Sequence, residues 1–341
     1  MRVQTRPELM PSPAAQSGPG STAAPDVVGN RPLAWPFGVA ARPYSPSISG
    51  RPVLLAFDTS PQAAAAARLV HAIAQQLHST VQVVSVVDTT PVPIPYPLDL
   101  AIALHGEVAD GVVHREHALG LSEALRAAVG TPVDWPSAIE LGEPVSVIAR
   151  RAERTRAALI VMGLRRHHLV DRAMHDETTL SVMRAATRPV LGVAEGLTGL
   201  PTRSLVAMDF SPGSVHAAAT TATLMARGGT MTLAFVESMR EYDLESSNGV
   251  IHTLGMAAAF AELTRALERS DLRVDHVILH HATPGSPSSI LLEHAEGQGF
   301  DLLAAGSARH GRLDRILLGS VSAELVRDSR HSVLIVPPSH A

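Results

Sequence analysis

The segments "RPVLLAFDTSP" (residues 51–61) and "RSLVAMDFSP" (residues 203–212) are two copies of one pattern in a chain of 341 residues. In each copy an apolar run ends in an aspartate, Asp58 or Asp209, and a Ser-Pro pair follows after one further residue. A short apolar run is typical of a buried strand, and Ser-Pro is typical of the first turn of a helix. The pattern therefore predicts a strand that leads directly into a helix, twice in the chain.

The repeat extends well beyond these segments. "LIVMGLRRHHLVDR" (residues 159–172) aligns with "LLAAGSARHGRLDR" (residues 302–315). Gly163 and Gly306 follow equivalent apolar runs and are 143 positions apart, and the same offset relates the last apolar runs of the two halves. A constant offset over such a length indicates a duplicated structural unit.

Within each half, short apolar runs rich in β-branched residues alternate with stretches of helical periodicity. For the first half we predict strands over 52–57, 81–87, 133–140, 158–162 and 189–193, and helices over 60–78, 105–129, 144–156 and 176–186. The second half repeats this order, with late strands over 274–281 and 332–338. Such alternation predicts an α/β fold of two tandem doubly wound domains, each with a parallel sheet covered by helices on both faces.

The sequence divides into a tail and two domains. Residues 1–50 are rich in Pro, Ala, Gly and Ser and lack hydrophobic periodicity, so we expect a disordered tail. The domains are expected over 51–195 and 203–338, joined by the linker "GLTGLPT" at 196–202.

The composition excludes several classes of function. The chain has no cysteine, which rules out disulfides, thiol catalysis and thiolate metal sites and fits a cytoplasmic protein. A formal net charge of −4 with only 3% aromatic residues argues against nucleic acid as a partner. No apolar run approaches the length of about 20 residues that a membrane span needs, so no membrane contact is expected.

A ligand site is expected in the second half, beyond the carboxyl ends of its parallel strands. Asp209, Val236 and Gly306 each lie at the end of a predicted strand. Gly319 and Ser320 open the helix that follows the last long loop. The start of a helix offers unpaired backbone N–H groups and the positive end of its dipole, both of which suit a phosphate group.

These residues resemble those of the universal stress protein family, and the chain looks like a tandem member. The resemblance is carried by the aspartate after the first strand of each half, by the last strands "PVLGV" and "SVLIV", and by "GSARHGRLDRILLGSVS" (residues 306–322). Nucleotide-binding members have Gly, two residues, Gly, nine residues and then Gly-Ser or Gly-Thr in this loop. The resemblance implies the adenine nucleotide alpha hydrolase-like fold. It also implies pairing of the halves through their last strands.

The resemblance further implies a non-enzymatic stress-response protein that binds ATP or a related adenine nucleotide, with Mg²⁺, mainly through the second half. The implied nucleotide-binding residues are Asp209, Ser211, Val236, Gly306, Ser307, Arg309, Gly319, Ser320, Val321 and Ser322. Nucleotide occupancy would alter the surface offered to protein partners or to a second copy of the chain.

Both halves depart from the family motif. Arg309 stands where the middle glycine is expected, and its side chain would either obstruct the loop or supply a guanidinium to the phosphates. In the first half Arg166 stands at that position, and Asp176-Glu177 replaces the Gly-Ser pair, so this half is expected to have lost nucleotide binding. A nucleotide-independent interaction scaffold remains the alternative.

Two other features are interpreted as structural. The histidine pairs His167-His168 and His280-His281 have no third ligand at a suitable spacing, so no metal site is predicted. The proline-rich stretch at 89–100 is interpreted as a crossover loop. No P-loop and no nucleophile elbow is present, and no catalytic residue is predicted.

Overall fold

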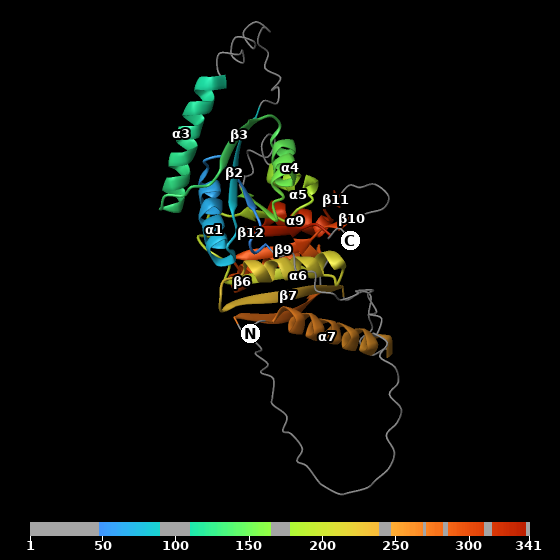
Figure 1. The fold of residues 1–341 in the computed structure, drawn as a ribbon. Coiled ribbons are helices and arrows are strands. Elements are labelled where there is room, and N and C mark those ends of the chain that lie inside the picture. The colour runs from blue at the N-terminus through green and yellow to red at the C-terminus, as the bar shows by residue number, and fades with distance from the viewer. Residues whose placement is uncertain are drawn as a thin grey trace, which may run out of the picture. The chain divides into compact units, whose positions relative to one another are not determined.

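The computed structural model describes residues 48–88, 110–164, 178–238, 247–268, 271–281, 286–309 and 316–338 (Figure 1). The elements of the first half are β1 (Val53–Ala56), α1 (Pro61–Leu77), β2 (Val81–Val87), α3 (Asp110–Val129), β3 (Ser137–Leu141), α4 (Pro144–Thr155), β4 (Leu159–Gly163), α5 (Thr178–Ala185) and β5 (Val190–Val193). Those of the second half are β6 (Arg203–Met208), α6 (Pro212–Leu224), β7 (Gly229–Ser238), α7 (Ser247–Leu267), β8 (Leu272–His281), α8 (Pro287–Gln298), β9 (Leu302–Gly306), β10 (Ala308–Arg309), β11 (Ile316–Leu317), α9 (Ser320–Asp328) and β12 (Ser332–Val336).

The two halves share one ten-stranded sheet with the order β3-β2-β1-β4-β5-β12-β9-β6-β7-β8. Strands within each half are parallel, whereas β5 and β12 pair antiparallel, with Leu191 opposite Leu334 and Gly192 opposite Val333. Each half therefore has the same strand order, and the second runs opposite to the first across the junction. The prediction of a doubly wound fold paired through the last strands is confirmed.

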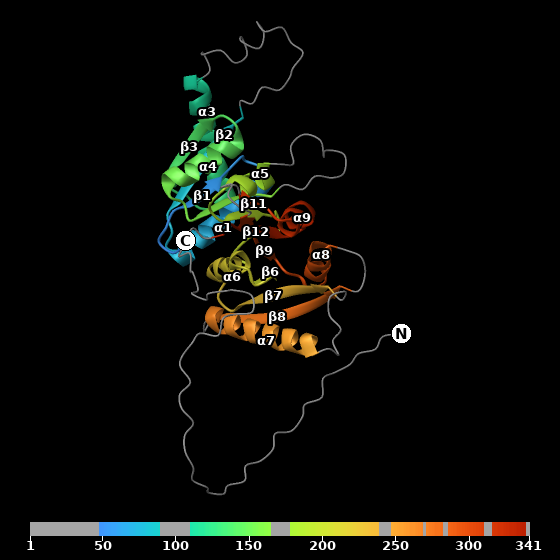
Figure 2. The same ribbon diagram turned by 90° about the vertical axis from the view of Figure 1, so that its right-hand side faces the viewer.

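Helices cover both faces of this sheet. Buried side chains of α1, α3, α6 and α7 form one core with one face of the strands, and those of α4, α5, α8 and α9 form a second core with the other face. Figure 2 shows α6 and α8 on opposite sides of β6 and β9. Each core contains residues of both halves, so the junction between β5 and β12 is covered by apolar packing as well as by strand hydrogen bonds.

Four helices begin with the same chemistry. Ser60, Ser211 and Ser286 cap α1, α6 and α8 through their hydroxyl oxygens, and Glu143 caps α4 through its carboxylate. A proline follows in each case, where its missing N–H costs no hydrogen bond. The Ser-Pro pairs at 60–61 and 211–212 thus mark the starts of α1 and α6 as predicted, and the helix predicted over 144–156 begins at Pro144.

Two local features differ from the sequence-based expectation. The strand predicted from residue 133 begins only at Ser137, because Pro136 has no N–H to offer a neighbouring strand and supplies only its carbonyl, which accepts from the N–H of Val83. The long loop after Gly306 contains a short antiparallel pairing in which Arg309 of β10 lies opposite Ile316 of β11. Most of the expected tail, the stretch at 89–100, and residues 165–177 lie outside the described residues.

Candidate functional site

The candidate site lies where the strand order of the second half reverses. β6 is flanked by β7 on one side and by β9 on the other, and the chain after β6 and after β9 enters helices on opposite faces of the sheet. In open α/β sheets ligands bind at this point. Asp209 follows β6 directly, and Val236 lies near the end of β7 at the same level, because Met208 pairs with Phe235.

The turn after β6 is held by Asp209. Its carboxylate oxygen Oδ1 accepts the backbone N–H of Ser211 at 2.9 Å, and the hydroxyl of Ser211 accepts the N–H of Ser214 at 3.3 Å. Phe210, between them, has φ of +56° and a ring that is 1% exposed. The ring packs edge-on against Phe260 at 4.8 Å between centroids, so burial of the ring offsets the cost of this unfavourable backbone conformation.

Gly306 is required by packing. A Cβ atom at this position would lie 2.3 Å from the carbonyl carbon of Gly213 and 2.6 Å from the nitrogen of Ser214, both in the first turn of α6. A Cβ atom on Gly213 would in turn lie 2.9 Å from the carbonyl oxygen of Ser307. The end of β9 and the start of α6 thus touch backbone to backbone.

The hydroxyl of Ser322 is used within the fold. It donates to the carbonyl oxygen of Gly306 at 2.9 Å, and the side chain is buried. Val321 packs against the buried cluster on the α9 side of the sheet. Of the residues expected at the site, these two therefore support the first turn of α9.

The start of α9 is open. Gly319 is the N-cap, and among the described residues no side chain caps the helix there and no atom lies within 4 Å of where its Cβ would be. Gly319 and Ser320 are both exposed. This exposed start of the helix, whose first N–H groups have no partner within the helix, lies beside the end of β9 to which Ser322 is bonded.

Ser307 places a buried hydroxyl group directly after Gly306, whose carbonyl oxygen accepts a hydrogen bond from the first turn of α9. Its backbone N–H donates to the carbonyl oxygen of Val336 at 2.8 Å, while its hydroxyl oxygen is buried and has no hydrogen-bond partner among the described residues. Leu164 is the equivalent residue of the first half and makes the same backbone bond, to Val193. Since leucine makes the same backbone hydrogen bond in the first half, the backbone geometry does not require the hydroxyl group of Ser307. The side chain of Arg309 lies outside the described residues.

The first half reproduces the supporting geometry. Asp58 accepts the N–H of Ser60 at 3.1 Å, and Thr59 has φ of +63°. Thr179 donates to the carbonyl oxygen of Gly163 at 3.2 Å, as Ser322 does to that of Gly306. Sequence reasoning did not identify this role of Thr179 and Ser322, although their common spacing from the glycine offered a signal. Arg166, His167-His168 and Asp176-Glu177 are among the residues that the structure does not describe.

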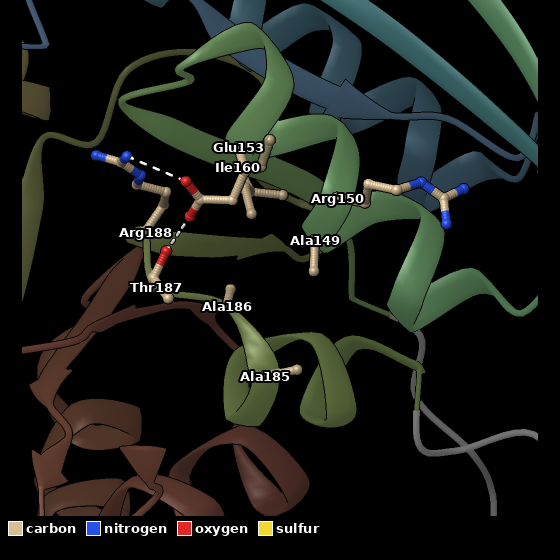
Figure 3. A pocket seen from close by; sticks show the side chains of 9 residues that line it. Ala149, Arg150, Glu153, Ile160, Ala185, Ala186, Thr187 and Arg188 are labelled. Carbon is tan, nitrogen blue, oxygen red and sulfur yellow. Dashed lines mark hydrogen bonds and ion pairs between the residues drawn. The ribbon is translucent and has the colours of Figure 1, made fainter. Parts of the chain in front are cut away.

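A cavity of about 170 Å³ lies at the other edge of the first half, where β4 begins (Figure 3). Alanines of α4 and α5 and Ile160 form its apolar walls. Glu153 at its rim accepts hydrogen bonds from Thr187 and Arg188. The cavity is smaller than the roughly 300 Å³ at which ligand pockets begin and is remote from the strand ends that carry the candidate site.

No metal centre emerges from the described residues, in which no three histidine, aspartate or glutamate side chains come together as potential ligands. His280 instead lies 3.3 Å from a carboxylate oxygen of Glu237 on the neighbouring strand. Across the part of the chain that the structure describes, no helix is both long and apolar enough to cross a membrane.

The sequence matches the universal stress protein family twice, over residues 50–194 and 202–337. The chain belongs to this family. Among solved structures it is similar to a universal stress protein from Archaeoglobus fulgidus, with 19% identity, a TM-score of 0.57, and coverage of 85% of this chain and 99% of that one. A putative universal stress protein from Pseudomonas aeruginosa matches with 14% identity and a TM-score of 0.56, covering 86% of this chain and 95% of its own. No curated protein matches the sequence.

Both likenesses to solved structures confirm the fold of this universal stress protein over both halves. At these identities they carry no information on its ligand. The ligand must therefore be argued from the residues at the end of β9 and the start of α9.

Proposed function

We propose that this universal stress protein binds ATP or a related adenine nucleotide, with Mg²⁺, through its second half and acts without catalysing a reaction. The observation that carries the proposal is the uncapped, exposed start of α9 at Gly319. The first N–H groups of a helix have no partner within the helix, and at the positive end of the helix dipole they favour an anion of the size of a phosphate group.

The surrounding residues suit the other parts of a nucleotide. Asp209 is exposed and would accept a hydrogen bond from the base or the ribose, and Val236 would contact the base. Ser307 and Ser320 would donate to phosphate oxygens, and Ser211 positions Asp209 through its backbone N–H. Val321, Ser322 and Gly306 would act indirectly, by fixing the first turn of α9 against β9.

The first half would support the second instead of binding a nucleotide itself. Its glycine, aspartate and serine are explained by the packing of α1 and by the cap of that helix, and Leu164 replaces Ser307. Nucleotide occupancy in the second half would change the surface offered to protein partners or to another copy of the chain. That requires a partner which prefers one nucleotide state.

Calorimetric titration of nucleotide-free protein with ATP and Mg²⁺ tests the proposal. We expect one site per chain, abolished in Gly319→Asp, because a carboxylate at the N-cap occupies the phosphate position and repels it. Asp is a better N-cap than Gly by a few tenths of a kcal/mol, so the variant should fold at least as well as the parent. Gly196→Asp, at an exposed linker glycine with no atom within 4 Å of its Cβ position, is the matched control and should bind normally.

Absence of heat and of thermal stabilisation at millimolar ATP would contradict the proposal and leave the nucleotide-independent scaffold. If binding is present, Arg309→Gly decides the role of the arginine. Weaker binding would assign its guanidinium to the phosphates, and tighter binding would show that its side chain obstructs the loop.

A further inference from the structure

An arginine cluster on the outer surface of the first half has no counterpart in the second. Arg150, Arg151 and Arg154 of α4 converge on the carboxylate of Glu140 on β3, at 3.4, 3.2 and 2.5 Å. Three guanidinium groups share one carboxylate, which leaves a surplus of two positive charges at this place.

The cluster is rigidly placed and still accessible. The side chains of Arg150 and Arg154 are 55% and 52% exposed, whereas that of Glu140 is only 16% exposed. Glu140 thus acts as an anchor beneath the guanidinium groups, and the side chains of Arg150 and Arg154 face solvent, whereas Nε of Arg151 is buried. Because the arginines are already held close together, an anion that binds them loses less side-chain entropy than it would with isolated arginines.

The neighbouring acidic group does not neutralise the cluster. Glu153, the acidic residue between these arginines on α4, is engaged by Arg188 and Thr187 across the cavity. Figure 3 shows Arg150 extending away from Glu153 and from that cavity. The surplus charge is therefore displayed on the outside of α4.

The duplication provides an internal comparison. α4 and α8 both have 12 residues and begin with a proline at equivalent positions. At the offset of 143, the positions of Arg150, Arg151 and Arg154 correspond to Glu293, His294 and Gly297. The fold of the helix does not require the arginines, and one half carries them without the other.

We propose that Arg150, Arg151 and Arg154 form a binding site for a small polyphosphate anion, separate from the nucleotide site proposed at α9. Guanidinium groups recognise phosphate through paired charge-assisted hydrogen bonds, and a chain of phosphates can contact more than one of them at once. The ligand chemistry is that of linked phosphates, supplied either by free inorganic polyphosphate or by the phosphate tail of a nucleotide.

Titration of the full chain with inorganic tripolyphosphate, at low and at physiological ionic strength, tests this site. We expect binding that weakens with salt and that falls at least about tenfold in R150Q/R154Q, since each lost charged hydrogen bond is worth roughly that factor. Glu140→Gln should bind more tightly, because it removes the competing carboxylate. Arg184→Gln, at an exposed arginine of α5, is the control for net charge and should match the parent.

A purely structural ion-pair cluster gives the opposite pattern. In that case Glu140→Gln would lower thermal stability without tightening tripolyphosphate binding, and R150Q/R154Q would bind as the parent does. Either result overturns the proposal, as does absence of tripolyphosphate binding to the parent. If Glu140→Gln fails to fold, the single variant Arg150→Gln, at the most exposed of the three arginines, is compared with Arg184→Gln. Weaker tripolyphosphate binding in Arg150→Gln alone supports the proposal, and equal binding in the two variants overturns it.

Repeating the titrations in a Gly319→Asp background separates the two sites and the two ligand sources. Tripolyphosphate binding that persists there and is lost in R150Q/R154Q lies at α4, whether or not the second half binds ATP. We expect ATP not to bind in this background, because the proposed nucleotide site is lost; ATP binding that remains and is lost in R150Q/R154Q would lie at α4 and make the phosphate tail of a nucleotide a source. If only tripolyphosphate binds, the source is free polyphosphate.

Discussion

Gly163 and Gly306 each end the fourth strand of a half, and each is pressed against the first turn of the helix that follows the first strand. A Cβ on Gly163 would lie 2.7 Å from the nitrogen of Ala63, as one on Gly306 would lie 2.6 Å from that of Ser214. Backbone contact alone therefore accounts for a glycine in both halves. The residues that distinguish the proposed nucleotide site from this common scaffold are Gly319 and Ser307, which the first half lacks.

Thr59 and Phe210 occupy equivalent turns with similar positive φ, +63° and +56°, but among the described residues only Phe210 has a compensating contact. Phe210 is buried, whereas Thr59 is exposed. A β-branched residue in the left-handed region is strained by about 1–2 kcal/mol. Thr59→Gly should therefore raise the free energy of unfolding by about 1 kcal/mol after the added flexibility of glycine in the unfolded chain is deducted. Urea unfolding measures this gain.

Phe210→Gly is the matched comparison at the equivalent position. It relieves the same backbone strain but removes a buried ring, so it should lower the free energy of unfolding by about 3 kcal/mol or more. A loss of stability in Thr59→Gly would show that its side chain makes a contribution which its exposure does not indicate.

At the scale of elements, the unpaired N–H groups at the starts of α4 and α8 are capped in two different ways. Glu143 caps α4 by accepting from the N–H groups of Val145 at 2.9 Å and of Ser146 at 2.7 Å. At α8, Ser286 is the cap, and Glu324 of α9 accepts hydrogen bonds from the hydroxyls of Ser286 and Ser288. Hydrogen bonding lowers the pKa of both carboxyls from the usual value of 4.5.

A lowered pKa in the folded state makes these carboxylates stabilising above pH 4.5. Between the folded and unfolded pKa values the unfolded chain binds more protons, so stability falls as the pH drops from 4.5 through the folded pKa. Glu143→Ala should cost about 1 kcal/mol at pH 7, and this cost should shrink in urea unfolding at an acidic pH below the folded pKa of Glu143, where the parent has also lost its charged cap. Glu123→Ala, at an exposed position of α3, should change stability little at either pH. An equal cost at both pH values would show that the capping carboxylate is not the source.

Sequence pattern alone predicted most elements because each signal is local. Apolar runs define the strands, and Ser-Pro pairs define the starts of α1 and α6. The late start of β3 was missed because Val133 fits a strand pattern while Pro136 prevents pairing before it. The β10–β11 pairing was missed because two-residue strands have no periodicity.

The candidate site was only partly predictable. Gly319 was identified from its place before a helix, but the absence of a cap and the open space around it are properties of the fold. The internal hydrogen bond of Ser322 and the backbone contact of Gly306 depend on how α6 and α9 meet β9, which no local pattern encodes.

At the scale of the whole molecule, the duplication gives a shared framework with different surfaces. The antiparallel pairing of β5 and β12 joins both halves into one sheet, and Ser332 of β12 accepts the N–H of Ala194 at 3.0 Å. The amide of Gln76 on α1 also donates to the carbonyl oxygen of Met225 at the end of α6. The second half has the open start of α9, and the first half has the arginine cluster of α4. The two halves therefore differ at their surfaces, while the junction between β5 and β12 joins them.

The linker should therefore be dispensable for keeping the halves together. No atom of the described residues lies within 4 Å of the Cβ positions of Gly196 and Gly199, so a protease site inserted after Thr198 has room on the surface. After cleavage we expect both fragments to elute together in size-exclusion chromatography and to unfold in a single transition, because the apolar residues of both cores come from both halves. Leu334→Ser, which places a polar group at a fully buried position opposite Leu191, should separate the cleaved fragments. Fragments that part without this substitution would mean that the covalent linker, and not the shared sheet, holds the pair together.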